Sequence, residues 1–324
     1  MVLAGMLPLS VAAIEPASAR ADGTYTISVC GPADGNVNHA LVFSSSRQTI
    51  VDAQNCNGSG KGQGLQAWPT ASTPGGQGGG WWFTAPSGTT ITSIQETGDY
   101  FASGGWIVQW SAGYRNLFRI GGLGECPLGQ PCVALFSPSG PQWSTSVDHA
   151  DKVGVDIICH ASTCPANDPG FGPAASLNVG QLMITVDESS PPSFPSGSIV
   201  GPLWTHAGWF STNAAPSIPG WTISYNAVDP GGVCNLLAEI VNAAGVVEQS
   251  DSHNVTPDDT QAAPCPARHG YTWAPNIAAL PDGPNYLRIE ASNPAGMTSQ
   301  ATGPSGVLLD VDNTPPTIQV ASAP

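Results

Sequence analysis

The sequence has very little positive charge. Only eight of its 324 residues are Lys or Arg, against 23 Asp and Glu, and the formal net charge is −15. Nucleic acids and anionic membranes are bound through clusters of basic side chains that neutralise phosphate groups. A chain with so few cations therefore argues against both kinds of partner, and its acidity is best explained as a contribution to solubility.

Long amphipathic segments rich in Leu, Glu, Lys and Arg are also missing. Charged residues make up 10% of the chain, while Gly contributes 39 residues and Pro 31. This composition excludes a helical bundle, because Gly and Pro are the poorest helix formers. The 41% of hydrophobic residues and the ten Trp supply enough apolar surface to offset the entropy of ordering the chain. We expect ordered β-structure with long turns.

The N-terminus predicts export. An apolar run over residues 1–14 is too short to span a bilayer, and two small-x-small patterns follow it, Ala17-Ser-Ala19 and Ala19-Arg-Ala21. We predict a signal peptide over residues 1–21 and a secreted or cell-surface location; the alternative is an N-terminal core strand. No later run approaches the roughly 20 apolar residues of a spanning helix, so we expect no membrane insertion.

Eight cysteines in an exported chain predict four disulfides. If the two halves of the chain fold independently, the two cysteines of the second half must pair with each other. Close spacing favours two short loop clips in the first half, and the remaining two cysteines then pair. The predicted bridges are Cys30–Cys56, Cys126–Cys132, Cys159–Cys164 and Cys234–Cys265. A zinc site at Cys159 and Cys164 lacks a second ligand pair, so we expect neither metal nor cofactor.

A repeated phrase divides the chain. Leu182–Pro192 and Val307–Pro316 both consist of an apolar strand, Val-Asp, two small or polar residues and Pro-Pro. Proline cannot donate to a strand ladder, so each strand must end there. The predicted parts are the following: one domain over 22–188, a second over 189–313, and a linker or the start of a further module over 314–324.

Runs of alternating apolar and polar residues predict an all-β fold. About nine such runs occur between turn residues in the first domain, which suits a jelly-roll or lectin-like β-sandwich. Roughly seven shorter strands in the second domain favour an immunoglobulin-like β-sandwich. We therefore expect two tandem β-sandwiches.

Two phrases resemble known exported proteins. Pro281–Gly296 is similar to the Leu-x-Asp-Gly-x-Tyr/His signature segment of bacterial immunoglobulin-like modules, although Asn293 stands where those modules usually have Asp. Gly79–Ile91 resembles the Trp-x-Phe-x-Ala-Pro-x-Gly-Thr-x-Ile phrase of large actinobacterial surface proteins. The resemblance implies a lectin-like or jelly-roll domain followed by an immunoglobulin-like module in an exported surface protein, and it is specific for architecture rather than for function.

Residue patterns for catalysis are weak. A glycosidase needs two carboxylates across a cleft, but Glu96-Thr-Gly-Asp99 is predicted to be a solvated hairpin tip. The Gly-x-Ser-x-Gly motif of serine hydrolases does not occur. His149 is the one His with two acids within three positions, in Asp148-His149-Ala-Asp151. These side chains could touch a cation, but a turn leading into a strand over 153–158 explains them equally well. These observations predict that the protein is not an enzyme.

Aromatic residues offer the better candidates for binding. Sugar rings stack on exposed Trp and Tyr, because the apolar face of the sugar covers the ring while its hydroxyls stay hydrated. Trp81 and Trp82 are adjacent, and successive side chains of a strand point to opposite faces, so one of the two rings is predicted to be partly exposed. The predicted ligand-binding candidates are Trp81, Trp82, Tyr100 and Tyr114.

The sequence thus predicts a non-catalytic, adhesin-type surface protein built of monomeric modules. Its expected ligand is a glycan or a cell-surface protein. One alternative is a secreted carbohydrate-active hydrolase whose catalytic pair is not evident in the sequence. Another is a purely structural stalk, which would show no exposed aromatic patch.

Overall fold

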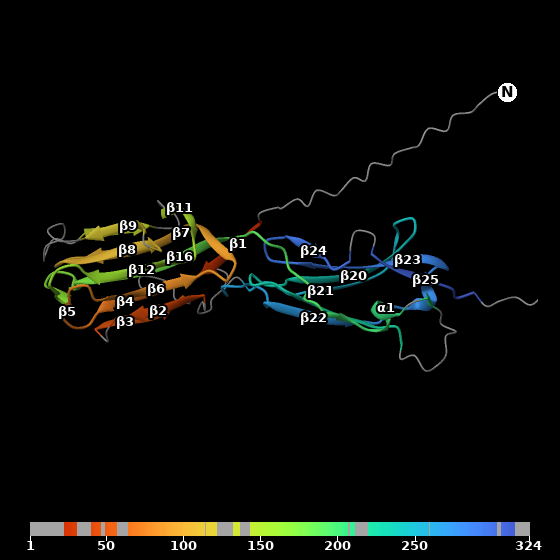
Figure 1. The fold of residues 1–324 in the computed structure, drawn as a ribbon. Coiled ribbons are helices and arrows are strands. Elements are labelled where there is room, and N and C mark those ends of the chain that lie inside the picture. Colours follow the sequence, from red (N-terminus) through yellow and green to blue (C-terminus); the bar gives the residue numbers. More distant parts are fainter. Residues whose placement is uncertain are drawn as a thin grey trace, which may run out of the picture.

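The chain is almost entirely β-structure, as the sequence predicts. The computed structural model describes residues 23–30, 40–46, 49–56, 64–113, 115–121, 132–136, 143–206, 208–210, 220–258, 260–302 and 306–314. The strands of these ranges form two groups of sheets, which we call the N-terminal unit (β1 to β16) and the C-terminal unit (β17 to β25). The two units lie end to end in an elongated molecule (Figure 1).

The N-terminal unit is built from two main antiparallel sheets. The seven-stranded sheet has the order β10-β7-β16-β4-β3, with β1 paired to β16 and β11 paired to β7, and the five-stranded sheet has the order β2-β6-β12-β8-β9. Two short pairs, β13-β5 and β14-β15, complete the unit. Its strands are β1 (Gly23–Val29), β2 (Leu41–Ser45), β3 (Ile50–Asn55), β4 (Gly64–Pro69), β5 (Thr73–Pro74), β6 (Gly78–Thr84), β7 (Thr89–Ala102), β8 (Trp106–Ala112), β9 (Arg115–Gly121), β10 (Cys132–Phe136), β11 (Trp143–Ala150), β12 (Lys152–Cys159), β13 (Thr163–Cys164), β14 (Asn167–Asp168), β15 (Gly172–Pro173) and β16 (Ala175–Glu188).

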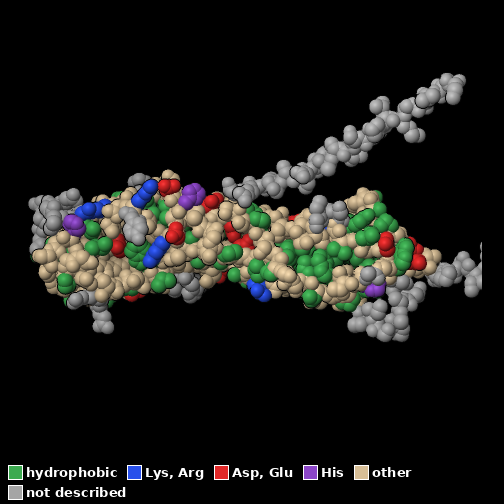
Figure 2. All heavy atoms as spheres, viewed as in Figure 1, with side chains coloured by type: hydrophobic (Ala, Val, Ile, Leu, Met, Phe, Trp, Pro, Cys, Tyr) green, Lys and Arg blue, Asp and Glu red, His purple; other side chains and the backbone are tan. Residues whose placement is uncertain are grey.

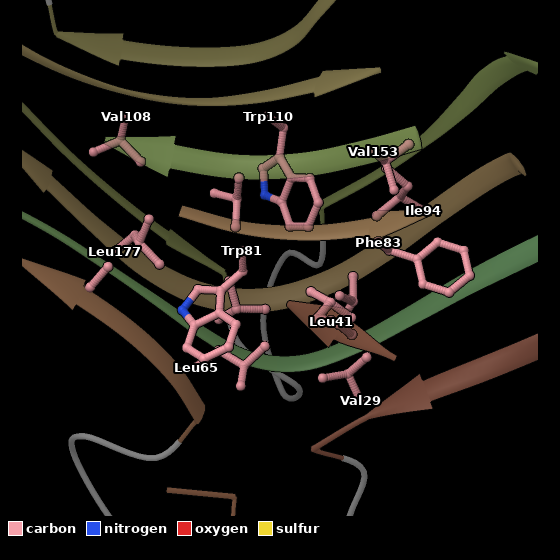
Figure 3. Close-up of a cluster of buried hydrophobic side chains, with 14 of the residues drawn as sticks. Val29, Leu41, Leu65, Trp81, Phe83, Ile94, Val108, Trp110, Val153 and Leu177 are labelled. Atoms are coloured by element: carbon pink, nitrogen blue, oxygen red, sulfur yellow. The ribbon is translucent and has the colours of Figure 1, made fainter. Parts of the chain in front are cut away.

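One hydrophobic cluster fills the space between these two sheets. Alternate residues of each strand point inward, so that Trp81, Phe83 and Trp110 of the five-stranded sheet meet Leu65 and Leu177 of the seven-stranded sheet (Figure 3). Along the long strand β16 the buried positions shift by one residue, from Leu177 and Val179 to Leu182 and Ile184, across an irregularity in its pairing between residues 179 and 182. Such a bulge preserves burial of the same face on both sides of it.

The C-terminal unit has its own sheets and its own hydrophobic cluster. A three-stranded sheet has the order β17-β19-β22, and a six-stranded sheet has the order β18-β25-β23-β20-β21 with β24 paired to β23. The elements are β17 (Ile199–Val200), α1 (Pro202–Thr205), β18 (Trp209–Phe210), β19 (Ile223–Val228), β20 (Asn235–Asn242), β21 (Val247–Asn254), β22 (Arg268–Trp273), the 3-10 turn Ile277–Ala279, β23 (Gly283–Ser292), β24 (Thr298–Gln300) and β25 (Val307–Val311).

Three of the four predicted disulfides are confirmed. The structure contains the bridges Cys30–Cys56, Cys159–Cys164 and Cys234–Cys265. Cys132 is also disulfide-bonded, while its predicted partner, Cys126, lies outside the described residues. Disulfides of this kind are typical of proteins that fold in an oxidising compartment.

Several predictions fall on segments beyond the described ranges. The predicted signal peptide, 1–21, and nearly all of the predicted tail, 314–324, lie there. Within the described ranges, no helix has the length and apolar character needed to cross a membrane. The division at residues 188 and 313 stays a prediction, and the two hydrophobic clusters take their buried residues from 25–186 and 203–311.

Candidate functional site

The adjacent tryptophans of β6 face opposite sides of the five-stranded sheet. Trp81 points inward and is fully buried, and its indole N–H donates to the carbonyl of Gln66 at 3.1 Å. Trp82 points outward and is partly exposed. This follows from the two-residue period of a strand. Trp81, predicted as a binding candidate, is therefore a core residue, and Trp82 is the ring that a ligand could reach.

The ring of Trp82 lies directly above a glycine of the neighbouring strand. Gly154 of β12 is paired with Trp82, and a Cβ atom added there would come within 2.2 Å of the ring. The missing side chain thus makes room for the indole to lie on the sheet. The Lys152 ammonium nitrogen lies over the ring at 4.6 Å from its centroid, a cation–π contact. Trp82 and Lys152 form what we call the aromatic platform.

A groove of about 760 Å³ adjoins this platform at Lys152. That volume is in the range of sites for small ligands. Its walls come from the end of β8, the start of β9, the end of β11 and the start of β12. The lining residues are Ala112, Gly113, Arg115, Leu117, Ser146, Val147, Asp148, His149, Ala150, Asp151 and Lys152. Figure 2 shows charged and His side chains gathered along this side of the N-terminal unit, where Figure 1 places β9 and β11.

An irregularity in β11 shapes the groove. The pairing of β11 with β7 shifts register between Ser146 and Ala150, and His149 has a φ of 46°. Non-glycine residues rarely adopt positive φ, and bulges of this kind re-aim side chains next to binding sites. Asp148 and His149 are both exposed as a result. The turn predicted at these two residues is wrong, since β11 runs through both of them and only Asp151 separates it from β12.

The two polar residues of this bulge take different partners. The Asp148 carboxylate accepts an ion pair from the Arg115 guanidinium at 3.3 Å. His149 Nδ1 lies 3.0 Å from the Thr90 hydroxyl and 3.8 Å from the Asp187 carboxylate. Within the described ranges, no three His, Cys, Asp or Glu residues are grouped closely enough to hold a metal ion.

A buried carboxyl lies on the same sheet face as the platform. Asp156 follows Gly154 by two residues and is only 8% exposed, and its Oδ1 atom has no hydrogen-bond partner. Burial raises the pKa of Asp156 to about 7, against an opposing hydrogen bond from Gln109. The charge of this face therefore changes near neutral pH, although Asp156 itself is too buried to touch a ligand.

Tyr100 and Tyr114 were the other predicted candidates. Tyr100 is 1% exposed, so its prediction as a surface platform is wrong. Its hydroxyl donates to Glu96 at 2.5 Å, and Glu96 is also buried. The predicted hairpin tip at 96–99 is wrong as well, because β7 continues through it. Tyr114 lies outside the described residues.

Sequence reasoning missed Arg115 and Lys152. Only five of the eight Lys and Arg residues are described, and Arg115, Arg119 and Lys152 all belong to β9 or β12. Their rarity in an acidic chain was the available signal. The contacts of Lys152 with Trp82 and of Arg115 with Asp148 depend on strand pairing between distant segments, which a single sequence does not display.

Comparisons with known proteins give distant likenesses. No protein family and no curated protein matches the sequence. Among solved structures, the adhesin domain of Epf from Streptococcus pyogenes is 12% identical, with 78% of each chain covered and a TM-score of 0.25. The Endo-D glycoside hydrolase domain from Streptococcus pneumoniae is 9% identical with a TM-score of 0.22, over 80% of this chain and 37% of that one.

A third likeness is to the β-glucuronidase of Bifidobacterium dentium. It is 10% identical with a TM-score of 0.18, over 79% of this chain and 46% of the glucuronidase. The chain thus spans about two fifths of the length of these two enzymes. At such TM-scores the likenesses carry no argument about activity or ligand, and the site must be judged by its own geometry.

Proposed function

We propose that this chain is a non-catalytic extracellular binding protein of adhesin type, which binds its ligand on the aromatic platform and in the adjoining groove. The observation that carries this proposal is the partly exposed Trp82, set above Gly154 and in contact with Lys152, which itself lines a groove of about 760 Å³. Exposed aromatic rings on otherwise polar surfaces are common contact sites. A purely structural stalk would have no need of this arrangement.

A glycan fits the chemistry of the site. The ring of Trp82 offers a flat apolar surface, and Arg115, Asp148 and Lys152 offer charged donors and acceptors for hydroxyl groups along the groove. The Lys152 ammonium lies over the ring in the free protein. A sugar that stacks there displaces it, and the flexible four-carbon stem of Lys152 allows that movement.

The proposal includes export of the protein from the cytoplasm, and the disulfides support this part of it. Three bridges in the described ranges suit an oxidising compartment, and the predicted signal peptide supplies the route. The chain would then act at the cell surface or in the medium.

A glycan-array measurement tests the proposal, with Trp82→Ala as the variant. We expect Trp82→Ala to weaken binding at least tenfold while the melting temperature stays within a few degrees of the original, because the ring is largely outside the core. Trp209→Ala is the matched control, since Trp209 is 61% exposed in the C-terminal unit. Equal binding by the Trp82 and Trp209 variants, or no bound glycan at all, would exclude a sugar on this platform.

A further inference from the structure

Two acidic residues from different units meet in a buried position. Glu188 is the last residue of β16, and Asp229 follows the last residue of β19. Each residue is only 2% exposed. Both carboxyl groups lie against Gly231: its N–H donates to Asp229 Oδ1 at 2.8 Å, and a Cβ atom on it would come within 2.5 Å of both Glu188 oxygens. One of these oxygens, Oε2, is buried with no hydrogen-bond partner. Two negative charges in such a place would repel each other strongly.

The carboxyl pair lies at the contact between the N-terminal and C-terminal units. The Tyr25 hydroxyl of β1 donates to the carbonyl of Ala262 at 3.2 Å. Ala262 and Ala295 of the C-terminal unit pack against the hydrophobic cluster of the N-terminal unit. Gly23 approaches Ala295 so closely that a Cβ on it would come within 2.6 Å of the Ala295 carbonyl. The two units therefore touch through fitted surfaces.

Hydrogen-bond donors surround Asp229. The Gly231 N–H donates to Asp229 Oδ1 at 2.8 Å, and the Asn293 amide donates to Asp229 Oδ2 at 3.4 Å. The Asn293 amide also reaches the carbonyl of Ser190 at 3.3 Å, while its oxygen accepts from the Met297 N–H. N–H groups aimed at a carboxylate stabilise its negative charge and take the directions that a metal ion would need.

The environment of Glu188 favours its neutral form. Burial is the main cause that raises the pKa of Glu188 above its usual range, and the hydrogen bond and charge of Asp229 raise it further. The N–H groups of Gly231 and Asn293 offset part of this rise. Tyr25 is the other titratable group that faces Glu188, and burial also raises the pKa of its hydroxyl. Thr89 of β7, paired with Glu188, carries no charge.

We propose that Glu188 and Asp229 share a single proton, and that this shared proton holds the two units together as one rigid body. With the proton present, Glu188 donates to Asp229 across the contact. Without it, two carboxylates face each other in a space closed to water, and the units separate to hydrate them. The junction is then a pH-sensitive joint that is closed at neutral pH and opens in alkali.

The sign of the pH effect follows from the raised pKa. In the unfolded chain Glu188 loses its proton above about pH 4.5, whereas in the folded chain it keeps that proton. The stabilisation is therefore complete below about pH 4.5 and declines as the pH rises toward the raised pKa. Tyr25 keeps its proton across this range, because its own pKa is raised.

Thermal melting from about pH 5 to about pH 10 tests the proposal on the full chain. Glu188→Gln supplies an amide that donates to Asp229 at every pH, so we expect the melting temperature of this variant to fall less with rising pH than that of the original protein. Glu239→Gln removes a more exposed carboxylate of β20 and controls for the loss of one charge from an acidic chain. Equal pH dependence in Glu188→Gln and the original protein would overturn the proposal.

Small-angle X-ray scattering reports on the joint itself. We expect the original protein to be rigid at neutral pH and to show a broader range of shapes in alkali, whereas Glu188→Gln stays rigid. Gly231→Ala should be flexible at every pH, because its Cβ would come within 2.5 Å of both Glu188 carboxyl oxygens. Gly170→Ala is the control, since its Cβ would meet an ordinary contact at 3.6 Å.

The competing occupant of this site is a divalent cation. If millimolar calcium raises the melting temperature of the original protein at neutral pH but leaves Glu188→Gln unchanged, the pair binds a cation and the shared proton is excluded. A scattering profile of the original protein that is unchanged between neutral and alkaline pH would likewise exclude it.

Discussion

The Tyr100 hydroxyl donates a 2.5 Å hydrogen bond to the Glu96 carboxyl in the interior of the N-terminal unit. The indole N–H of Trp110 in turn donates to the Tyr100 hydroxyl at 3.0 Å. All three side chains are at most 1% exposed. Burial raises the pKa of Glu96 to about 8, even though the hydrogen bonds from Tyr100 and Trp110 act in the opposite direction. The interior therefore holds a neutral carboxylic acid at physiological pH.

This raised pKa predicts a stability that falls as the pH rises. Glu96 in the unfolded chain is ionised above about pH 4.5, whereas in the folded chain it keeps its proton up to about pH 8. The free energy of unfolding should therefore fall by about 1.4 kcal/mol per pH unit within this window on account of Glu96 alone. Urea unfolding of the original protein and of Glu96→Gln, at several pH values, isolates this contribution as the difference between their slopes.

Tyr100→Phe is the companion variant in that experiment. It removes the hydroxyl that links Glu96 to Trp110. The buried Glu96 carboxyl and the Trp110 indole N–H then lose this hydrogen-bond partner. We expect a loss of about 1–3 kcal/mol in the free energy of unfolding at neutral pH. If both variants unfold like the original protein at every pH, the chain of hydrogen bonds contributes nothing to stability.

Gly154→Ala should displace the ring of Trp82. The added Cβ would overlap the indole, and the ring is the side that can move, because Gly154 is held in a strand that pairs with β6 on one side and β8 on the other. We expect a red shift of tryptophan fluorescence and a loss of ligand binding similar to that of Trp82→Ala. Gly170→Ala, in an exposed turn with room for a methyl group, serves as the reference. Unchanged fluorescence would show that the ring does not depend on Gly154.

Removal of the Cys234–Cys265 bridge should destabilise the C-terminal unit more than removal of the Cys159–Cys164 bridge destabilises the N-terminal unit. The two bridges join residues 31 and 5 positions apart. The chain-entropy estimate gives about 4 kcal/mol for the longer loop and about 2 kcal/mol for the shorter one. Paired Cys→Ser variants measured by chemical unfolding check the order. The reverse order would show that strain or packing, rather than loop length, dominates.

The rival hydrolase function has a specific test. Asp148 and Asp151 both line the groove, and a glycosidase would require two such carboxylates. We expect no turnover of polysaccharide, ester or peptide substrates above the blank, because Asp148 is ion-paired with Arg115 and both carboxyls are exposed to solvent. Turnover that disappears in Asp148→Asn or Asp151→Asn would establish an enzyme and remove the non-catalytic proposal.

Strand alternation was readable from the sequence, but long-range packing was not. The opposite facing of Trp81 and Trp82 follows from local geometry alone. The burial of Glu96 and Tyr100 does not, because Gly98 between them was interpreted as a turn residue. In the structure Gly98 lies within β7, where a Cβ would come within 2.4 Å of the Asn178 carbonyl. The glycine serves the close approach of two strands and does not end one.

The roles of the residues in the groove and at the contact between the units could not be predicted from the sequence either, because they depend on long-range packing. Lys152 reaches Trp82 from another strand, and Glu188 meets Asp229 across the contact between units. Each contact joins residues about 40 or more positions apart in the chain. Composition marked these residues only as scarce cations or ordinary acids, so their roles depend on the fold.

The pairing of β1 with β16 has a mechanical consequence. Gly23 is paired with Glu188, and Val29 with Leu182, so the first residue of one strand and the last residue of the other lie at the same end of an antiparallel pair. Tension applied between Gly23 and Glu188 would pull the two strands apart from that end. The hydrogen bonds, which run across the strands, would then carry the load one after another rather than together. When such tension is applied, β1 should separate from β16 one residue pair at a time. This separation should need only a low force and should precede unfolding of the remainder of the N-terminal unit.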